Sequence, residues 1–155
     1  MTDQINEQKR IESKLEVQTY IDRLQYALDS GSVTLFFQAD RRIDSSKDKK
    51  YTNRYTLAKL FPDQDEVVVL KRELSYLSIE EYIETVKDTR YPKRSEMRVF
   101  CRQYNEGDVY IKIRVELISM EQAIYNNYIF VMSFHFAEWE HKESDFPYRE
   151  GGINK

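Results

Sequence analysis

Apolar and polar residues alternate most regularly in the stretch 108–115. Every second position is apolar (Val109, Ile111, Ile113, Val115), and the positions between them carry Tyr110, Lys112 and Arg114. A period of two places successive side chains on opposite faces of a β-strand. The pattern therefore predicts a half-buried strand with one cationic, aromatic face.

A second run, 128–136, is more apolar and predicts a more central strand. It ends in a single histidine, His135, between two phenylalanines. A further strand is expected over 97–103, followed by a turn at 105–107 that leads into 108–115. Two adjacent strands would bring His135 near the polar face of 108–115.

The first half of the chain shows helical spacing and the second half shows strands. Patterns resembling capping boxes at 63–66 and 78–81 predict a helix over 67–70, despite the strand propensity of its valines, and another through Val86. The remaining expected elements are a polar helical lead-in at 1–16, a helix from Val17 to Gly31, a strand at 33–37, a long basic loop at 39–54, a short helix before Pro62, a polar connection at 88–95 and a longer turn at 118–127.

This order predicts an α+β domain in which an antiparallel β-meander packs against the N-terminal and central helices. We expect one domain over 1–155, with its core at 17–137 and an acidic C-terminal tail at 138–155. Within the tail, Phe146, Pro147 and Tyr148 are expected to attach it to the body.

Composition limits the class of protein. Only 4 Gly and 3 Pro in 155 residues argue against a disordered chain, and one cysteine cannot form an internal disulfide. The polar start does not resemble a signal peptide, and no apolar run approaches the roughly 20 residues of a membrane span. We therefore expect a cytoplasmic protein without a membrane partner.

Charge leaves two interpretations open. The net charge of −3 does not attract nucleic acid on average, but basic residues concentrate between Arg41 and Lys59. Acidic residues concentrate elsewhere, at 63–66, 80–84 and 138–145. The surface is either an ordinary mixed-charge surface or one with a real basic face.

The residues on the paired strands suit phosphodiester chemistry. His135 can act as an acid or base near neutral pH, Tyr110 can donate a proton or stack on a base, and Lys112 can stabilise the charge that develops on phosphorus. Arg114, Arg98 and Arg102 are the candidates for phosphate contacts, the last two because their spacing places them on one strand face. The alternatives are a structural histidine among aromatic residues and a solvated face of long cationic side chains.

Other reactive residues point to no site. Cys101 is expected to be a buried, small apolar residue, and His141 to be exposed in the acidic tail. Two histidines and one cysteine form no metal-ligand spacing, and no glycine-rich phosphate loop is present. We therefore expect neither a metal nor a cofactor.

Three strings occur in a suggestive order: Leu-Ser-Ile-Glu-Glu-Tyr at 77–82, Gly-Asp-Val-Tyr-Ile-Lys-Ile at 107–113, and Val-Met-Ser-Phe-His at 131–135. Their order resembles the MqsR type of toxin (motility quorum-sensing regulator) in the RelE-like superfamily of bacterial messenger-RNA interferases. Members show a Leu-Ser-x-x-Asp-Phe/Tyr helix start, a Gly-x-Val-Tyr-Ile/Leu-Lys strand and a Val-Ser-Phe-Lys/His strand. The likeness covers roughly residues 19–136.

The resemblance implies a RelE-like fold and a cytoplasmic endoribonuclease that cleaves messenger RNA without a metal and is inhibited by a cognate antitoxin. The family's active-site tyrosine falls on Tyr110, and its basic residue on the last strand falls on His135. Its lysine falls on Glu84, so that role is not carried over, and Lys87 one turn later is the candidate replacement. Its glutamine falls near Val99, where no equivalent exists. The alternative is a non-catalytic protein-binding module, such as a mobile-element regulator or inhibitor, which the acidic balance and these two departures favour.

Overall fold

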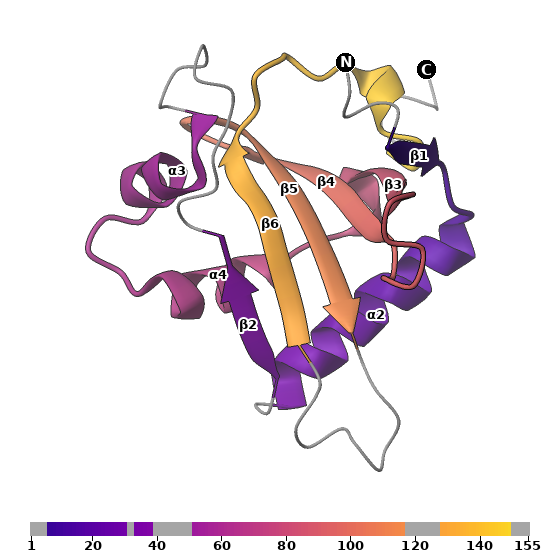
Figure 1. Cartoon of the computed structure of the whole chain (residues 1–155). Coiled ribbons are helices and arrows are strands. Elements are labelled where there is room, and N and C mark those ends of the chain that lie inside the picture. Colours follow the sequence, from indigo (N-terminus) through magenta and orange to yellow (C-terminus); the bar gives the residue numbers. More distant parts are fainter. Residues whose placement is uncertain (1–5, 31–32, 39–50, 117–127, 150–155) are drawn as a thin grey trace.

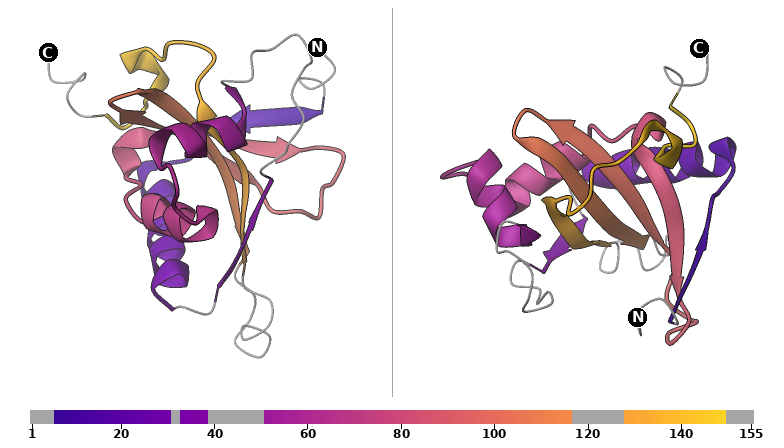
Figure 2. Two further views of the ribbon diagram at one scale, coloured as in Figure 1. Left: turned by 90° about the vertical axis from the view of Figure 1, so that its left-hand side faces the viewer. Right: turned by 90° about the horizontal axis from the view of Figure 1, so that it is seen from above.

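The computed structural model describes residues 6–30, 33–38, 51–116 and 128–149. These residues form an α+β arrangement, a curved sheet with helices on one face, which confirms the predicted class (Figures 1 and 2). The strands are β1 (Glu7–Arg10), β2 (Thr34–Phe37), β3 (Tyr82–Asp88), β4 (Met97–Tyr104), β5 (Gly107–Glu116) and β6 (Tyr128–Phe136). The helices are α2 (Lys14–Ser30), α3 (Asn53–Leu60) and α4 (Glu66–Leu74), with 3-10 turns η2 (Ile79–Glu81) and η3 (Glu143–Asp145).

The described strands form one mixed sheet in the order β1-β3-β4-β5-β6-β2. Strands β3 to β6 make an antiparallel meander in which each strand pairs with the next along the chain. At one edge β1 pairs antiparallel with β3, and at the other β2 pairs parallel with β6. The predicted meander is therefore present, with β3 as one strand more than expected. Of the two edge strands, β1 was not predicted, whereas β2 confirms the strand predicted at 33–37.

The hydrophobic core lies between the helices and one face of the sheet, which we call the helix face. On β5 this face carries the apolar residues at alternate positions, including Val109, Ile111 and Ile113. Helix α2 packs against it through residues such as Ile21 and Leu24, as its helical spacing predicts. The opposite face, which we call the second face, carries the intervening residues of β5.

The helix predicted from 78 through Val86 is wrong. The local cap does form, because the Ser78 backbone N–H donates to Glu81 Oε1 at 3.0 Å, but only the single turn η2 follows it. Tyr82 then begins β3 opposite Phe100 and is fully buried, and its hydroxyl accepts a hydrogen bond from the Glu12 backbone N–H at 3.0 Å. Pairing with β1 and β4 outweighs the local helical spacing.

The predicted helical lead-in at 1–16 is also wrong within the described residues. Glu7–Arg10 form strand β1, and α2 begins only at Lys14. Its start is a capping box: Ser13 Oγ accepts from the Glu16 backbone N–H at 3.2 Å, and the Ser13 N–H donates to Glu16 Oε1 at 3.0 Å.

The two central helices begin close to their predicted positions. The end of the loop expected at 39–54 belongs to α3, which starts at Asn53 with Thr52 as its cap; residues 39–50 lie outside the described residues. The predicted helix over 67–70 is confirmed within α4. Its cap is Asp65 rather than Asp63, since the Asp65 carboxylate accepts from the Val68 N–H at 3.0 Å.

The segment that follows β6 packs back onto the sheet. The Ala137 N–H donates to the Asp108 carbonyl at 2.9 Å, and Phe146 is buried. Tyr148 stacks on Tyr82 with 6.1 Å between ring centroids, so the predicted attachment of the tail at 146–148 is confirmed. The turn expected at 118–127 and the last residues, 150–155, lie outside the described residues. No helix of the described chain combines the length and apolar character needed to cross a membrane.

Candidate functional site

The residues predicted to form a polar face come together on the second face. Tyr110 lies opposite His135 in the β5–β6 pair, and Lys112 lies opposite Ser133. Arg114 lies opposite Phe130, after a bulge that leaves Met132 without a direct partner. The predicted adjacency of His135 to this face is therefore present, whereas the catalytic roles of these residues stay predictions.

Tyr110 and His135 form a stacked pair. Their ring centroids are 5.3 Å apart and the ring planes differ by 23°. His135 Nδ1 lies 2.9 Å from the Phe136 carbonyl oxygen, which can only accept, so Nδ1 carries the proton and donates. In the neutral ring this leaves the lone pair on Nε2, the nitrogen that could act as a base. His135 is only 9% exposed, so its ring is closely surrounded by other atoms of the protein.

The two cations that β5 places on this face are largely buried and paired. Lys112 is 8% exposed, and its Nζ lies 3.0 Å from Glu7 Oε2 on β1. The Arg114 guanidinium lies 5.1 Å from the centre of the Phe130 ring, and its Nε is 4.0 Å from Glu116 Oε1. The second face therefore combines a stacked tyrosine–histidine pair with two cations whose charge is already matched by carboxylates of the same chain.

Arg98 and Arg102 do not belong to this face, which corrects the prediction that they contact the same phosphates. They lie opposite Ile113 and Val109, so both point to the helix face. Arg98 forms a bidentate pair with Glu12, at 2.8 and 2.9 Å, and also lines a cavity of about 410 Å³ beside α2. The Arg102 guanidinium donates through Nη1 to Glu81 Oε2 at 3.1 Å.

Lys87 does not replace the family's lysine on the second face. Its Nζ donates to the backbone carbonyls of Pro92 and Arg94, so it closes the loop between β3 and β4. Glu84, on which the family's lysine falls, does lie on the second face, because it is opposite Val99. Its carboxylate is 3.5 Å from Lys9 Nζ. Neither residue supplies a cation next to His135.

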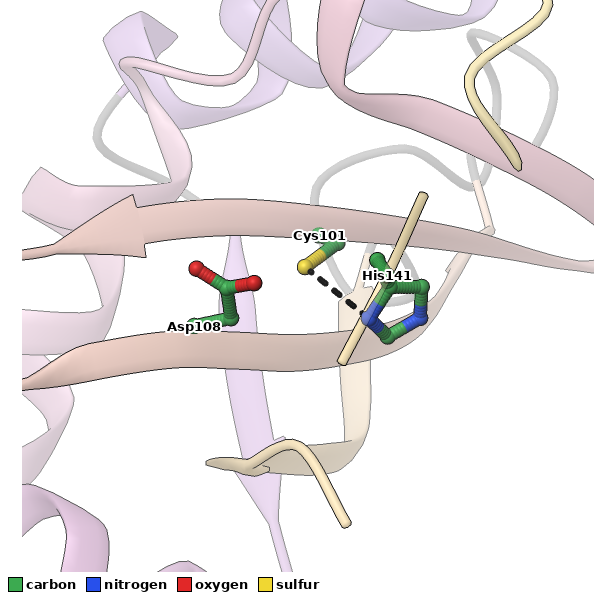
Figure 3. Close-up of side chains that lie close together, drawn as sticks. All are labelled: Cys101, Asp108 and His141. Atoms are coloured by element: carbon green, nitrogen blue, oxygen red, sulfur yellow. Dashed lines mark hydrogen bonds between the residues drawn. The ribbon is translucent and has the colours of Figure 1, made fainter. Parts of the chain in front are cut away.

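A second cluster on the same face was missed by the sequence interpretation. Cys101, Asp108 and His141 each place one possible ligand atom within 4.8 Å of the others (Figure 3). Cys101 is fully buried, as predicted, and burial together with the neighbouring Asp108 raises the pKa of its thiol to about 12. His141 was expected to be solvent-exposed, but it is half-buried and its Nδ1 lies 3.6 Å from Cys101 Sγ.

Part of this cluster could have been found from the sequence. Cys101 lies opposite Tyr110, and Asp108 precedes Tyr110 by two residues, so the hairpin itself places the thiol and the carboxylate diagonally on one face. His141 gives no comparable signal, because its position depends on how the segment after β6 folds back.

No family model, curated protein or solved structure matches this chain in the comparisons made. Function therefore has to be inferred from the chemistry of the second face.

Proposed function

We propose that this protein is an endoribonuclease that cleaves messenger RNA without a metal, at the Tyr110–His135 pair on the second face. The observation that supports the proposal is the stack of these two rings, 5.3 Å apart, beside Lys112 and Arg114 on one strand. The resemblance of the strings at 77–82, 107–113 and 131–135 to the MqsR type of toxin points to the same activity. In that setting the protein would be a cytoplasmic toxin inhibited by an antitoxin protein.

The proposed reaction transfers the phosphate to the 2′-hydroxyl of the same ribose. His135 Nε2 removes the hydroxyl proton, the 2′-oxygen bonds to phosphorus, and the bond to the leaving 5′-oxygen breaks. Tyr110 donates its hydroxyl proton to that oxygen. The proton held by His135 then passes through solvent to Tyr110, which restores both residues. General acid–base catalysis of this kind contributes typically about 10²–10⁴-fold. The products are a 2′,3′-cyclic phosphate and a 5′-hydroxyl.

The phosphate needs a cation, and Lys112 is the residue nearest in sequence to Tyr110 that can supply one. Its ammonium is paired with Glu7, and the residue as a whole is 8% exposed. We propose that the phosphate replaces the Glu7 carboxylate on Lys112, which requires β1 to move away from the second face. Arg114 would then contribute a second positive charge to the developing phosphorane.

A second candidate function, a non-catalytic protein-binding module, is favoured by a different observation. Lys112 and Arg114 have carboxylates of the same chain within 4.0 Å, and Arg98 and Arg102 bind carboxylates on the helix face. A face whose charges are matched internally does not require a phosphate. Expression in bacteria gives a first discrimination, since a toxin arrests growth and a binding module need not.

The deciding experiment incubates the purified protein with mixed-sequence single-stranded RNA in EDTA and maps the ends of any product. His135→Gln and Tyr110→Phe test the pair, because both replacements are close in size to the residue removed. Tyr26→Phe, at an exposed tyrosine of α2, is the matched control. Circular dichroism of each variant establishes that it folds.

Cleavage with 2′,3′-cyclic ends that is lost in both site variants and kept in the control would support the proposal. Cleavage that survives His135→Gln would place the reaction elsewhere. If neither naked RNA nor translating messages are cut, the binding module is the better interpretation.

A further inference from the structure

The Cys101–Asp108–His141 cluster brings three different metal-binding groups together from three separate parts of the chain. Cys101 lies on β4, Asp108 near the start of β5, and His141 on the segment after β6. Figure 3 shows the carboxylate of Asp108 and the ring of His141 on either side of the Cys101 sulfur. The possible ligand atoms all lie within 4.8 Å of one another.

The spacing of the thiol and the imidazole fits two ligands of a tetrahedral metal ion. With Zn–S of about 2.3 Å and Zn–N of about 2.0–2.1 Å, two ligands at a tetrahedral angle are about 3.6 Å apart. The Cys101 Sγ to His141 Nδ1 distance is 3.6 Å. A thiolate, an imidazole and a carboxylate are the three ligand types that zinc takes from proteins.

We propose that Cys101 Sγ, His141 Nδ1 and one Asp108 carboxylate oxygen bind a divalent d-block ion of the zinc class. Three protein ligands leave a fourth position open, as in zinc sites that hold a water molecule or a substrate atom. On binding, the Cys101 thiol loses its proton to solvent and the sulfur donates to the ion, so one proton is released from this group. The imidazole binds in its neutral form, with its proton on Nε2.

The ion would attach the segment after β6 to the β4–β5 hairpin. Other contacts already hold this segment near the site: the Ala137 N–H donates to the Asp108 carbonyl at 2.9 Å, and Phe146 is buried with its ring 6.1 Å from that of His141. The ligands are thus held by both regular strands and a packed segment, and the thiol and imidazole already have the separation that the ion needs. This inference is independent of the ribonuclease proposal, since it concerns a different set of side chains.

A thiol–imidazole hydrogen bond without a metal is the competing explanation of the same distance. A nucleophilic role for Cys101 is not favoured, because burial and Asp108 raise the pKa of its thiol to about 12. The Cys101 sulfur also lies between the Asp108 carboxylate and the His141 ring (Figure 3). Asp108 is therefore not placed to orient the imidazole as a general base.

The test is direct metal binding by the full chain after removal of bound metal with a chelator. Zinc is titrated in competition with a chromogenic chelator, and cobalt is added separately to record its absorption spectrum. We expect one zinc ion per chain, a thiolate-to-cobalt charge-transfer band, and a higher melting temperature with zinc. His141→Gln and Asp108→Asn should each weaken zinc binding by more than the roughly 10–100-fold that follows loss of an outer-shell partner.

Glu140→Gln is the matched control, since Glu140 is exposed, adjacent to His141 and outside the cluster. Its zinc affinity should equal that of the unaltered protein. His141→Gln removes a partly exposed ligand, so its folding can be confirmed from its melting temperature without zinc. Zinc binding that is unchanged in both site variants, or a cobalt spectrum without the thiolate band, would overturn the proposal and leave only the hydrogen bond.

Discussion

Lys112 on β5 and Glu7 on β1 form an ion pair of 3.0 Å although β3 and β4 separate their strands in the sheet. Three inter-strand spacings of about 4.8 Å would place β1 and β5 about 14 Å apart in a flat sheet. The pair therefore requires the sheet to curl toward the second face at its β1 edge, as the view from above indicates (Figure 2).

Removing the Glu7 carboxylate should leave the Lys112 ammonium without its ion-pair partner. If the second face binds RNA, Glu7→Gln makes the Lys112 ammonium available for a phosphate, and affinity for single-stranded RNA should rise. The slope of log affinity against log salt should steepen by about 0.7 for the one added contact. Fluorescence anisotropy with a labelled oligonucleotide measures both quantities.

Glu80→Gln is the control for net charge, because Glu80 is exposed on η2 and the same negative charge is removed. An equal rise in RNA affinity in both variants would mean that overall charge, rather than Lys112, is responsible. No gain in Glu7→Gln would contradict RNA binding at this face.

Glu12 and Arg98 should make stability depend on pH. Burial on its own raises the pKa of Glu12, but the hydrogen bonds from Arg98 and Thr85 hold that pKa below its ordinary value of 4.5. The unfolded carboxylate binds its proton near 4.5 while the folded one stays ionised to lower pH. The stabilisation is therefore complete above this pH and is lost as the pH falls through the lowered folded pKa.

Glu12→Gln should lower the free energy of unfolding at neutral pH by about 3 kcal/mol, because it leaves the largely buried Arg98 charge without its partner. The substitution should also make the free energy of unfolding fall less steeply as the pH is lowered. Urea unfolding from neutral to acidic pH measures both effects, with Glu106→Gln, at an exposed turn residue, as the control. An acid response identical in Glu12→Gln and the unaltered protein would show that other groups set it.

Asn53 should be among the most sensitive polar positions. Its side-chain amide donates to the carbonyls of Gln38 and Met132, at 2.7 and 2.9 Å, and its carbonyl oxygen accepts from the Phe134 N–H at 3.0 Å. Strand β2 pairs with β6 only as far as Val131, so Asn53 bonds the backbone of β6 beyond the end of β2. Asn53→Leu should cost about 3 kcal/mol, since buried unsatisfied groups cost about 1–3 kcal/mol each.

Amide hydrogen exchange locates this effect. The Phe134 amide should exchange faster in Asn53→Leu, whereas Lys59→Ala, at an exposed position of the same helix, should leave it unchanged. Unaltered protection of Phe134 in Asn53→Leu would show that the Asn53 side chain is dispensable. The sequence interpretation placed Asn53 in a loop, since a buried asparagine gives no periodic signal.

What could be predicted from the sequence was set by strong local periodicity. The alternation of 108–115 and the apolar run at 128–136 predicted β5, β6 and the face shared by Tyr110 and His135. Tyr82 shows the opposite case. A capping pattern and helical spacing predicted a helix, but the distant partners Phe100 and Glu12 determine a strand there. Such non-local pairing has no signature within the segment itself.

The face of the sheet on which Arg98 and Arg102 lie is decided by the register of β4 against β5, and a shift of one residue would change it. A three-residue turn at 105–107 would place Arg102 opposite Tyr110, on the second face. The observed pairing of Tyr104 with Gly107 leaves a two-residue turn, and Arg102 lies opposite Val109 instead. A shift of one residue moves a strand's whole set of side chains to the other face.

Gly107 should therefore be the residue that sets this register. Its φ of +148° is a conformation that side chains other than glycine rarely adopt, while a Cβ there would meet only Phe136 at 3.5 Å, an ordinary contact. Gly107→Ala should destabilise the protein through backbone strain, by about 1–3 kcal/mol. Glu106→Ala, at the preceding exposed turn position, should have little effect. Thermal or urea unfolding of both variants measures the difference. Equal stability of the two would mean that the turn relaxes easily and that the register is set by the pairing of β4 with β5 alone.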